Sequence, residues 1–176
     1  MSCFLTQGFV NSCRNNTGGV KSVYFASFSN IGTPSIVSGS LASTGSFFVS
    51  GSGGRFYQYQ QRKQVADFVE TATVSEPNGT VYYDQVVTVQ LPQMSANVRN
   101  ELVQLAQNSV MAIVQDNNGN YWLAGSYAGL DLNAGKSQTG KNYGDLNGYI
   151  LPFHGMEQYP MVQVPSGSIA GLLIPY

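Results

Sequence analysis

One stretch, from Val81 to Gly125, constrains the fold more than any other part of the chain. Its first part, VYYDQVVTVQL (81–91), alternates in polarity, and only Gln85 interrupts the apolar face at the odd positions. Alternation over this length predicts a half-buried β-strand. Pro92 is expected to end this strand, because proline donates no backbone hydrogen bond to a sheet.

The next part of this stretch predicts a helix followed by a hairpin. Apolar residues recur at helical spacing in SANVRNELVQLAQN (95–108), and Ser95 stands where an N-cap is expected. We therefore expect one amphipathic helix over about residues 95–107. VMAIVQ (110–115) and YWLAG (121–125) flank a DNNGN turn, whose Asn-Gly step favours a tight hairpin.

Composition indicates a β-rich chain with an unusually neutral exterior. The 176 residues are 43% hydrophobic and only 10% charged, with a net charge of −1, 11 Tyr and 9 Phe. A globular surface usually carries more charge, and aromatic residues are favoured at protein interfaces. We interpret residues 1–176 as a single domain, much of whose exterior is either covered by neighbours or neutral and polar. An ordinary β domain with aromatic strands is the alternative.

Further segments predict additional strands. VKSVYFASF (20–28) is largely apolar on both faces, which predicts a strand inside a sandwich or barrel wall. FYQYQQRK (56–63) and DFVETATVS (67–75) predict two more, and the second should form a hairpin with the strand described first. Pro152 indicates an edge position or a bulge. The apolar C-terminal GLLIPY is expected to dock on its own domain or on a neighbour.

The stretch from Ser29 to Gly54 has no charged residue and is rich in Ser, Gly and Thr. Loops of this length are unusual in compact domains, so we expect an arm or hairpin that adds to, or lies across, an adjacent subunit. Aromatic residues near its end would anchor it. The expected subunit-interface residues are Phe47, Phe48, Phe56 and Tyr57.

The motifs that resemble chemical sites lack the context that their chemistry needs. Gly135-Lys136-Ser137 looks like the end of a phosphate-binding loop, but the glycine spacing is wrong and no helix is expected to follow. His154, the single histidine, has no acidic residue nearby in sequence and is interpreted as structural. Asp116 and Asp145 lie at turns, where they bond the backbone. We expect no enzyme activity, no catalytic, cofactor-binding or metal-binding residue, and no cofactor.

The N-terminal sequence has no basic region followed by a long apolar core, so we expect no signal peptide and no membrane span. Cys3 and Cys13 are then expected to stay reduced, although a disulfide between them is geometrically possible. Lys and Arg form no cluster, which argues against strong electrostatic binding of nucleic acid.

The order of these signals resembles structural proteins of tailed bacteriophages, particularly those of gut Bacteroidetes, and looks like a tail-tube or related tail-ring subunit. The similarity covers roughly Cys13 to Val164. It rests on Gly18-Gly19-Val20 with the aromatic strand that follows, NGTVYYDQVVTVQL, RNELVQLAQ, IVQDNNGNYWLAG and GDLNGYILPFHGMEQYP.

The resemblance implies a non-enzymatic virion protein with a mainly β fold: an antiparallel β-sandwich or barrel with one flanking α-helix. It implies self-assembly into rings, commonly hexameric, which stack around a channel where DNA passes without sequence-specific binding. Other virion proteins would be partners, a membrane would not, and the protein would be made in the host bacterial cytoplasm and end in the virion tail. Channel walls in that family are often acidic, whereas this chain has only 9 Asp and Glu residues.

Two alternatives stay open at this point. Within the same class, the chain would be a head-to-tail connector or a capsid accessory protein. From another class, it would be a carbohydrate-binding or hydrolytic tail module, with Trp122 as the aromatic platform for a sugar.

Overall fold

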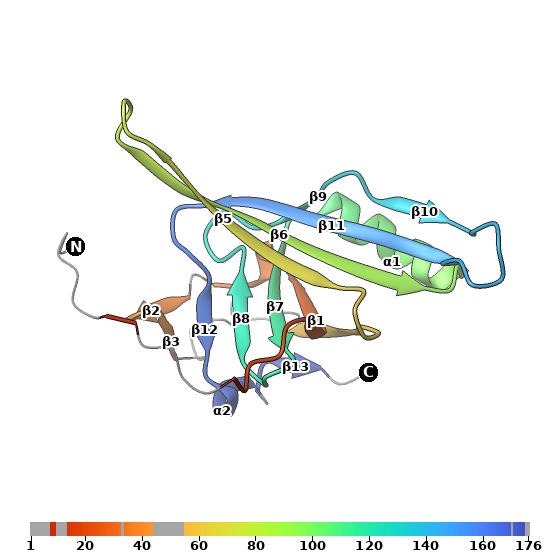
Figure 1. Cartoon of the computed structure of the whole chain (residues 1–176), viewed down its shortest axis with the longest axis horizontal. Helices are drawn as coiled ribbons and strands as arrows, with labels where there is room; N and C mark the ends of the chain where they lie inside the picture. Colours follow the sequence, from red (N-terminus) through yellow and green to blue (C-terminus); the bar gives the residue numbers. More distant parts are fainter. Residues whose placement is uncertain (1–7, 10–13, 33, 44–54, 170, 175–176) are drawn as a thin grey trace.

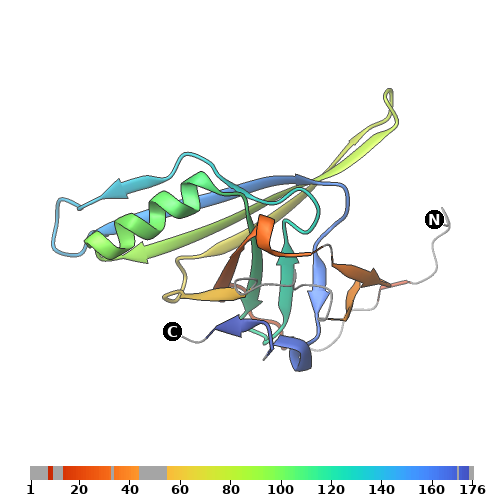
Figure 2. The same cartoon turned by 180° about the vertical axis from the view of Figure 1, so that it is seen from behind.

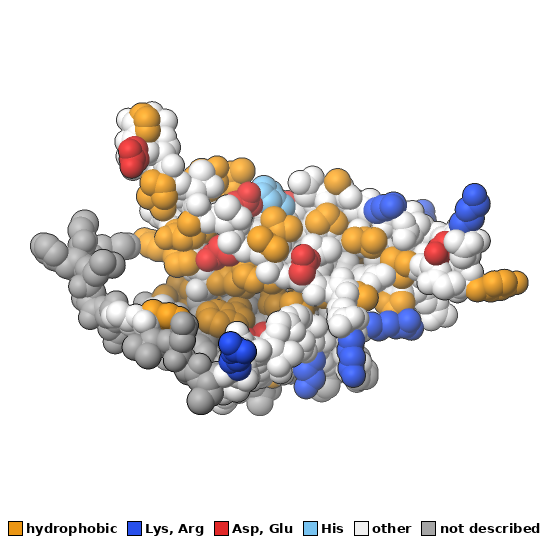
Figure 3. Space-filling model, viewed as in Figure 1, with side chains coloured by type: hydrophobic (Ala, Val, Ile, Leu, Met, Phe, Trp, Pro, Cys, Tyr) orange, Lys and Arg blue, Asp and Glu red, His pale blue; other side chains and the backbone are white. Residues whose placement is uncertain are grey.

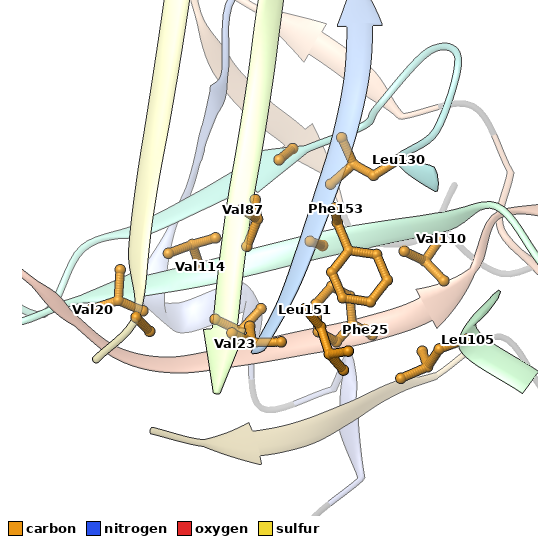
Figure 4. Packing of buried hydrophobic residues seen from close by; sticks show 14 of the residues in the cluster. Val20, Val23, Phe25, Val87, Leu105, Val110, Val114, Leu130, Leu151 and Phe153 are labelled. Carbon is orange, nitrogen blue, oxygen red and sulfur yellow. The ribbon is translucent and has the colours of Figure 1, made fainter. Parts of the chain in front are cut away.

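The computed structural model describes residues 8–9, 14–32, 34–43, 55–169 and 171–174. Two β-sheets and one long helix make up most of this part of the chain (Figures 1 and 2). The strands of one sheet run across those of the other, and the side chains between the sheets form the main core (Figure 4). The fold is a β-sandwich with a flanking helix, which confirms the predicted fold class.

The larger sheet has eight strands in the order β13-β4-β1-β7-β8-β12-β3-β2. All neighbours are antiparallel except the pairs β12–β3 and β13–β4, which are parallel. The strand bounds are β1 (Val20–Ser27), β2 (Ser35–Val37), β3 (Ser40–Ser43), β4 (Phe56–Gln60), β7 (Val110–Asp116), β8 (Tyr121–Ala124), β12 (Val162–Val164) and β13 (Leu173–Ile174).

The smaller sheet has five strands in the order β10-β11-β6-β5, with β9 also paired to β11. All of its pairs are antiparallel. The bounds are β5 (Asp67–Ser75), β6 (Thr80–Pro92), β9 (Asp131–Leu132), β10 (Lys136–Gln138) and β11 (Gly148–Glu157), and the helices are α1 (Ala96–Gln107), α2 (Ser166–Ile169) and the short 3-10 helix η1 (Phe28–Asn30).

Strand β1 is a wall between two cores, as its apolar sequence predicts. Val23 and Phe25 point into the main core, whereas Tyr24 and Ala26 point to a second core on the other face of the larger sheet. The Phe25 ring lies 4.5 Å from the ring of Phe153 on β11 (Figure 4). Burial of a side chain of this size stabilises the fold by about 1.5–3 kcal/mol.

The C-terminal segment closes the second core. Leu172 is fully buried there, and β13 pairs with β4. The prediction that the apolar tail docks on its own domain is therefore confirmed for residues 171–174.

Helix α1 begins at the predicted cap and covers one end of the main core. The Ser95 hydroxyl accepts a hydrogen bond from the backbone N–H of Val98 at 3.3 Å. Val98, Leu102 and Leu105 pack against the main core. α1 thus lies along the core-facing side of the smaller sheet (Figure 2).

Pro152 lies in the interior of the smaller sheet, which contradicts the edge position, one of the two alternatives predicted for it. β11 runs between β6 on one side and the short strands β9 and β10 on the other. Pro152 faces Thr88 of β6, and its carbonyl accepts the N–H of Asn133 at 2.9 Å. Asn133 follows β9 and precedes β10, so the neighbouring strand is interrupted where the residue without an N–H sits.

The described part of the expected arm belongs to the fold of its own chain. β2 and β3 form a hairpin, and β3 extends the larger sheet by pairing with β12. Leu41 holds β3 in place, because its side chain is buried in the second core. Within residues 34–43 the predicted hairpin is therefore part of its own sheet, and its contact with an adjacent subunit stays a prediction. Residues 44–54 lie outside the described residues.

Residues 16–19 are held against the β7–β8 turn before β1 begins. The Asn118 side chain bonds both the N–H and the carbonyl of Thr17, each at 2.9 Å. Asn117 donates from its side chain to the Gly18 carbonyl at 2.7 Å and from its backbone to the Gly19 carbonyl at 3.1 Å. Gly19 has a φ of +102°, and a Cβ there would lie 2.8 Å from Asn117 Nδ2, so glycine is required.

Candidate subunit interface

The smaller sheet has one face that the described part of the chain leaves uncovered. Odd-numbered side chains of β6, such as Val87 and Val89, enter the main core, so the even-numbered ones point away from it. Helix α1 lies behind the smaller sheet in Figure 1 and in front of it in Figure 2. We call the uncovered face the outer face, and its members include Val69, Thr71, Tyr82, Asp84, Val86, Thr88, Pro152, His154 and Met156.

The outer face is apolar for a surface that meets solvent. Val69 is 50% exposed, Met156 58% and Tyr82 36%. The register places Val69, Val86 and His154 in one row across β5, β6 and β11. Figure 3 shows hydrophobic side chains between scattered acidic ones on this side of the molecule. Single exposed apolar residues are ordinary, but a set that spans three strands is typical of a contact surface.

The β5–β6 hairpin projects beyond the body of the molecule (Figures 1 and 2). Val74 and Val81 face each other near its tip and are 63% and 50% exposed. They continue the core-facing side of the sheet past the end of the core. β5 is also the last strand of the smaller sheet, so among the described residues no strand pairs with its free side. An open edge with exposed aliphatic side chains favours pairing with another chain.

His154 lies on the outer face and has an acidic partner. Its Nε2 lies 2.6 Å from Asp84 Oδ1, and the two side chains are 30% and 35% exposed. Asp84 lies on β6 beside Val86, the residue that faces His154. The acid was not visible along the sequence because only the pairing of two distant strands brings it close. The residues in register with His154 are Val86 and Asp131, neither of which is a Ser or Cys nucleophile.

Residues 125–130 run from β8 of the larger sheet to β9 of the smaller one, and the segment between β11 and β12 runs back; we call them the first and the second crossing segment. Gln85 connects the β5–β6 hairpin to the first crossing segment. This side chain is 1% exposed. Its Oε1 accepts the N–H of Gly125 at 3.0 Å, and its Nε2 donates to Glu70 Oε2 at 2.9 Å. Glu70 Oε2 also accepts the N–H of Met161 at 2.7 Å, on the second crossing segment. Gln85, which interrupts the apolar pattern of β6, is therefore buried with both polar atoms of its side chain hydrogen-bonded.

Glu157 holds the first crossing segment from the end of β11. Its side chain is buried, and its carboxylate accepts the N–H of Tyr127 and the N–H of Ala128, each at 3.0 Å. Burial raises the pKa of the Glu157 carboxyl above its ordinary value, and the backbone hydrogen bonds oppose this rise. Sequence reasoning missed Glu157 because its donors are about 30 residues away in the chain.

The four residues predicted to form the interface have different positions. Phe56 is fully buried in the second core, because β4 lies between β1 and β13 and points this ring inward; this corrects its interpretation as an interface residue. Tyr57 is 51% exposed and borders a groove of about 120 Å³ beside α1. Phe47 and Phe48 lie outside the described residues, so their role stays a prediction.

Other motifs that resembled chemical sites have structural positions. Lys136 lies in β10, not at the start of a helix. The Asp116 carboxylate accepts the N–H groups of Asn118 and Asn120, at 2.9 and 2.8 Å, as expected for a residue at a turn. Trp122 is partly buried, and its indole N–H lies 3.4 Å from Asp116 Oδ2. The Trp122 ring is therefore not an exposed platform.

Within the described residues, no three His, Cys, Asp or Glu side chains are grouped so that they could hold a metal ion. A search of the same residues found no helix with the length and apolar character needed to span a membrane. Cys3 and Cys13 lie outside this part of the chain.

Comparison with protein-family models, with curated proteins and with solved structures found no match to this chain. A function is therefore proposed from the surfaces described above and from the resemblance in the sequence pattern.

Proposed function

We propose that this chain is a non-enzymatic structural subunit of a bacteriophage tail tube or tail ring, which assembles with copies of itself around the DNA channel. The observation that carries the proposal is the outer face with the open β5 edge beside it. Both features belong to one sheet, and that sheet also carries the projecting hairpin. A sheet with these features favours growth by addition of strands from another copy.

Edge-to-edge pairing of identical copies gives a ring when each copy is rotated from the previous one by the same angle and these rotations add up to a full turn. β5 forms one edge of the smaller sheet, and β9 with β10 forms the other. Contact between unlike edges is heterologous, and such contacts produce closed rings or open filaments. A closed ring leaves no free edge, which removes the aggregation hazard of an exposed strand.

The low charge of the outer face also supports the proposal. Asp84 is paired with His154, and Asp67, in register with Thr88, is exposed at the β5 edge of the same face. Few charges have to be desolvated when neighbouring copies cover the edges of such a surface, so the cost of burial is low. The same composition gives a weakly charged channel, which differs from the acidic walls that the resemblance implies.

The first test is assembly of the purified protein, measured by light scattering after gel filtration and by negative-stain imaging. Val69→Lys places a charge at the β5 edge of the outer face, where Val69 is 50% exposed. We expect this change to weaken association by about 100-fold, because an unpaired ammonium resists burial. Rings of uniform size should form with the unchanged chain.

Val103→Lys is the matched control. Val103 is 43% exposed on α1, on the opposite side of the smaller sheet from the outer face. This variant should assemble as the unchanged chain does. A chain that stays monomeric at every concentration, or equal losses in both variants, would contradict the proposed assembly.

A further inference from the structure

The larger sheet carries a hollow of about 470 Å³ on the face that points away from the main core. One end of this face is apolar and buried as the second core. The other end is polar and open, and ring assembly through the smaller sheet makes no use of it. We call it the glutamine shelf, and it is defined by Ser22, Tyr24, Gln58, Gln115 and Tyr121.

The side chains of the glutamine shelf form a hydrogen-bond chain that runs in one direction. Gln58 Nε2 donates to the Tyr24 hydroxyl at 3.3 Å, and the Tyr24 hydroxyl donates to Gln115 Oε1 at 3.5 Å. Gln115 Nε2 then donates to the Tyr121 hydroxyl at 2.8 Å. Gln58 Nε2 also lies 3.4 Å from Ser22 Oγ. In this arrangement Gln115 points its oxygen toward Tyr24 and its nitrogen toward Tyr121, and the oxygen of Gln58 lies outside the chain.

This direction determines what the shelf offers to a ligand. Within the described residues, no hydrogen bond involves Gln58 Oε1 at the first end or the hydroxyl proton of Tyr121 at the last. The shelf thus presents an acceptor at one end and a donor at the other. A group that both donates and accepts, such as an alcohol hydroxyl, matches both ends.

The charge of the glutamine shelf further limits the chemical class of the ligand. Among the described residues that line the hollow, Lys21 is the one with a charge, and none carries a carboxylate. Burial raises the pKa of the Tyr24 phenol, so this link of the chain keeps its proton at neutral pH. The partly buried Tyr121 ring supplies apolar surface beside the amides, and the Tyr24 ring, 4% exposed, packs behind it with the two centroids 6.5 Å apart.

We propose that the glutamine shelf binds a neutral, hydroxyl-rich ligand, namely a short saccharide. Hydroxyl groups of the sugar bond to Gln58 Oε1 and to the Tyr121 hydroxyl, and a C–H face of the sugar lies against the Tyr121 ring. Because the network is already formed, binding orders few side chains. The hollow is open, so we expect dissociation constants of about 1 mM. This proposal is independent of ring assembly.

Saturation-transfer difference NMR tests the proposal, because it detects the bound saccharide at any size of protein assembly. The probes are maltotriose, cellotriose and chitotriose, each titrated separately against the full chain. We expect saturation of ring protons for at least one probe, with half-saturation at about 1 mM. No transfer to any of the three at about 20 mM would overturn the proposal.

Tyr121→Phe removes only the hydroxyl at the donor end of the chain. We expect affinity to fall about tenfold, as for the loss of one well-placed hydrogen bond. Tyr143→Phe is the matched control, because Tyr143 is fully exposed in the β10–β11 loop. Circular dichroism and the thermal midpoint confirm that both variants fold.

Two results would overturn the assignment of the site. One is equal affinity in Tyr121→Phe and the unchanged chain. The other is saccharide transfer that is seen in the dilute protein and lost when the protein self-associates, which would make the shelf a contact between copies.

Discussion

Strands β1 and β6 contribute to the same main core, yet they use their faces differently. β1 is buried on both faces, with Val23 and Phe25 on one side and Tyr24 on the other. β6 buries one face and leaves the other on the outer face of the smaller sheet. A strand with two buried faces is committed to stability, whereas a strand with one buried face keeps a surface for contact.

The sequences of β1 and of β5, the neighbour of β6 in the smaller sheet, reflect the same difference. VKSVYFAS, in β1, has apolar residues at consecutive positions, whereas DFVETATVS, in β5, alternates them with Thr and Glu. The contrast predicts that changes in β1 alter folding and that changes in β5 alter assembly.

Phe25→Ala should have the largest effect on folding. The side chain is 2% exposed and packs on Phe153, so its removal leaves a cavity in the main core. We expect the free energy of unfolding to fall by about 3–5 kcal/mol, measured by urea denaturation. Tyr82→Ala, on the outer face, should cost less than about 1 kcal/mol. Similar losses at both positions would remove the contrast between the two strands.

Gly155→Ala should have the next largest effect, because Gly155 lies on β11 where Gly129 and Leu130 of the first crossing segment pass close to it. A Cβ at this position would lie 2.5 Å from the Gly129 carbonyl oxygen and 2.7 Å from Leu130 Cδ2. We expect a loss of about 1–3 kcal/mol in the free energy of unfolding. Gly144→Ala is the control, since no atom lies within 4 Å of its Cβ position. An unchanged urea midpoint in Gly155→Ala would contradict the close approach.

The pH dependence of stability tests the junction between the sheets. The raised pKa of Glu157 means that the folded chain holds this proton more tightly than the unfolded chain does. The contribution of Glu157 to the free energy of unfolding is therefore fully present below the ordinary pKa of 4.5, and it is lost as the pH rises through the raised pKa.

The comparison is between the unchanged chain and Glu157→Gln. The stability advantage of the unchanged chain should fall as the pH rises above 4.5, with a slope of at most about 1.4 kcal/mol per pH unit. Urea denaturation at several pH values measures this difference. A difference that grows with pH would show that the carboxylate is favoured in the fold.

Val74→Thr should have the smallest effect. Val74 is 63% exposed near the hairpin tip, so we expect a change below about 0.5 kcal/mol in the free energy of unfolding. Val23→Thr places the same hydroxyl in the main core and should cost about 1–3 kcal/mol. Equal urea midpoints for the two variants would show that β1 is not a strand buried on both faces.

The elements that depend on local pattern were predictable from the sequence. The strand at 81–91, the helix capped by Ser95, the hairpin across DNNGN and the strand at 67–75 all appear close to their expected bounds. Each depends on spacing within a short window, or on a turn residue whose backbone preference is known.

The features that depend on distant strands were not predictable. The place of Pro152 depends on where β9 and β10 stop, and the partner of His154 depends on the register of β6 against β11. Phe56 has the same aromatic character as Tyr57, and only the packing of β4 shows which ring points inward. Alternation showed that one face of β5 is apolar. It did not show whether the face with Phe68 or the face with Val69 packs against the core.

The two sheets also differ in how their strands are spread along the chain. All strands of the smaller sheet lie between residues 67 and 157, whereas the larger sheet needs strands from both sides of that segment. Pairings between distant segments form slowly, because a long loop has to close first. During synthesis, β5, β6, α1 and β11 emerge before β12 and β13. The open β5 edge is therefore present before the larger sheet is complete, and under the proposed assembly growing chains on neighbouring ribosomes would pair through it too early.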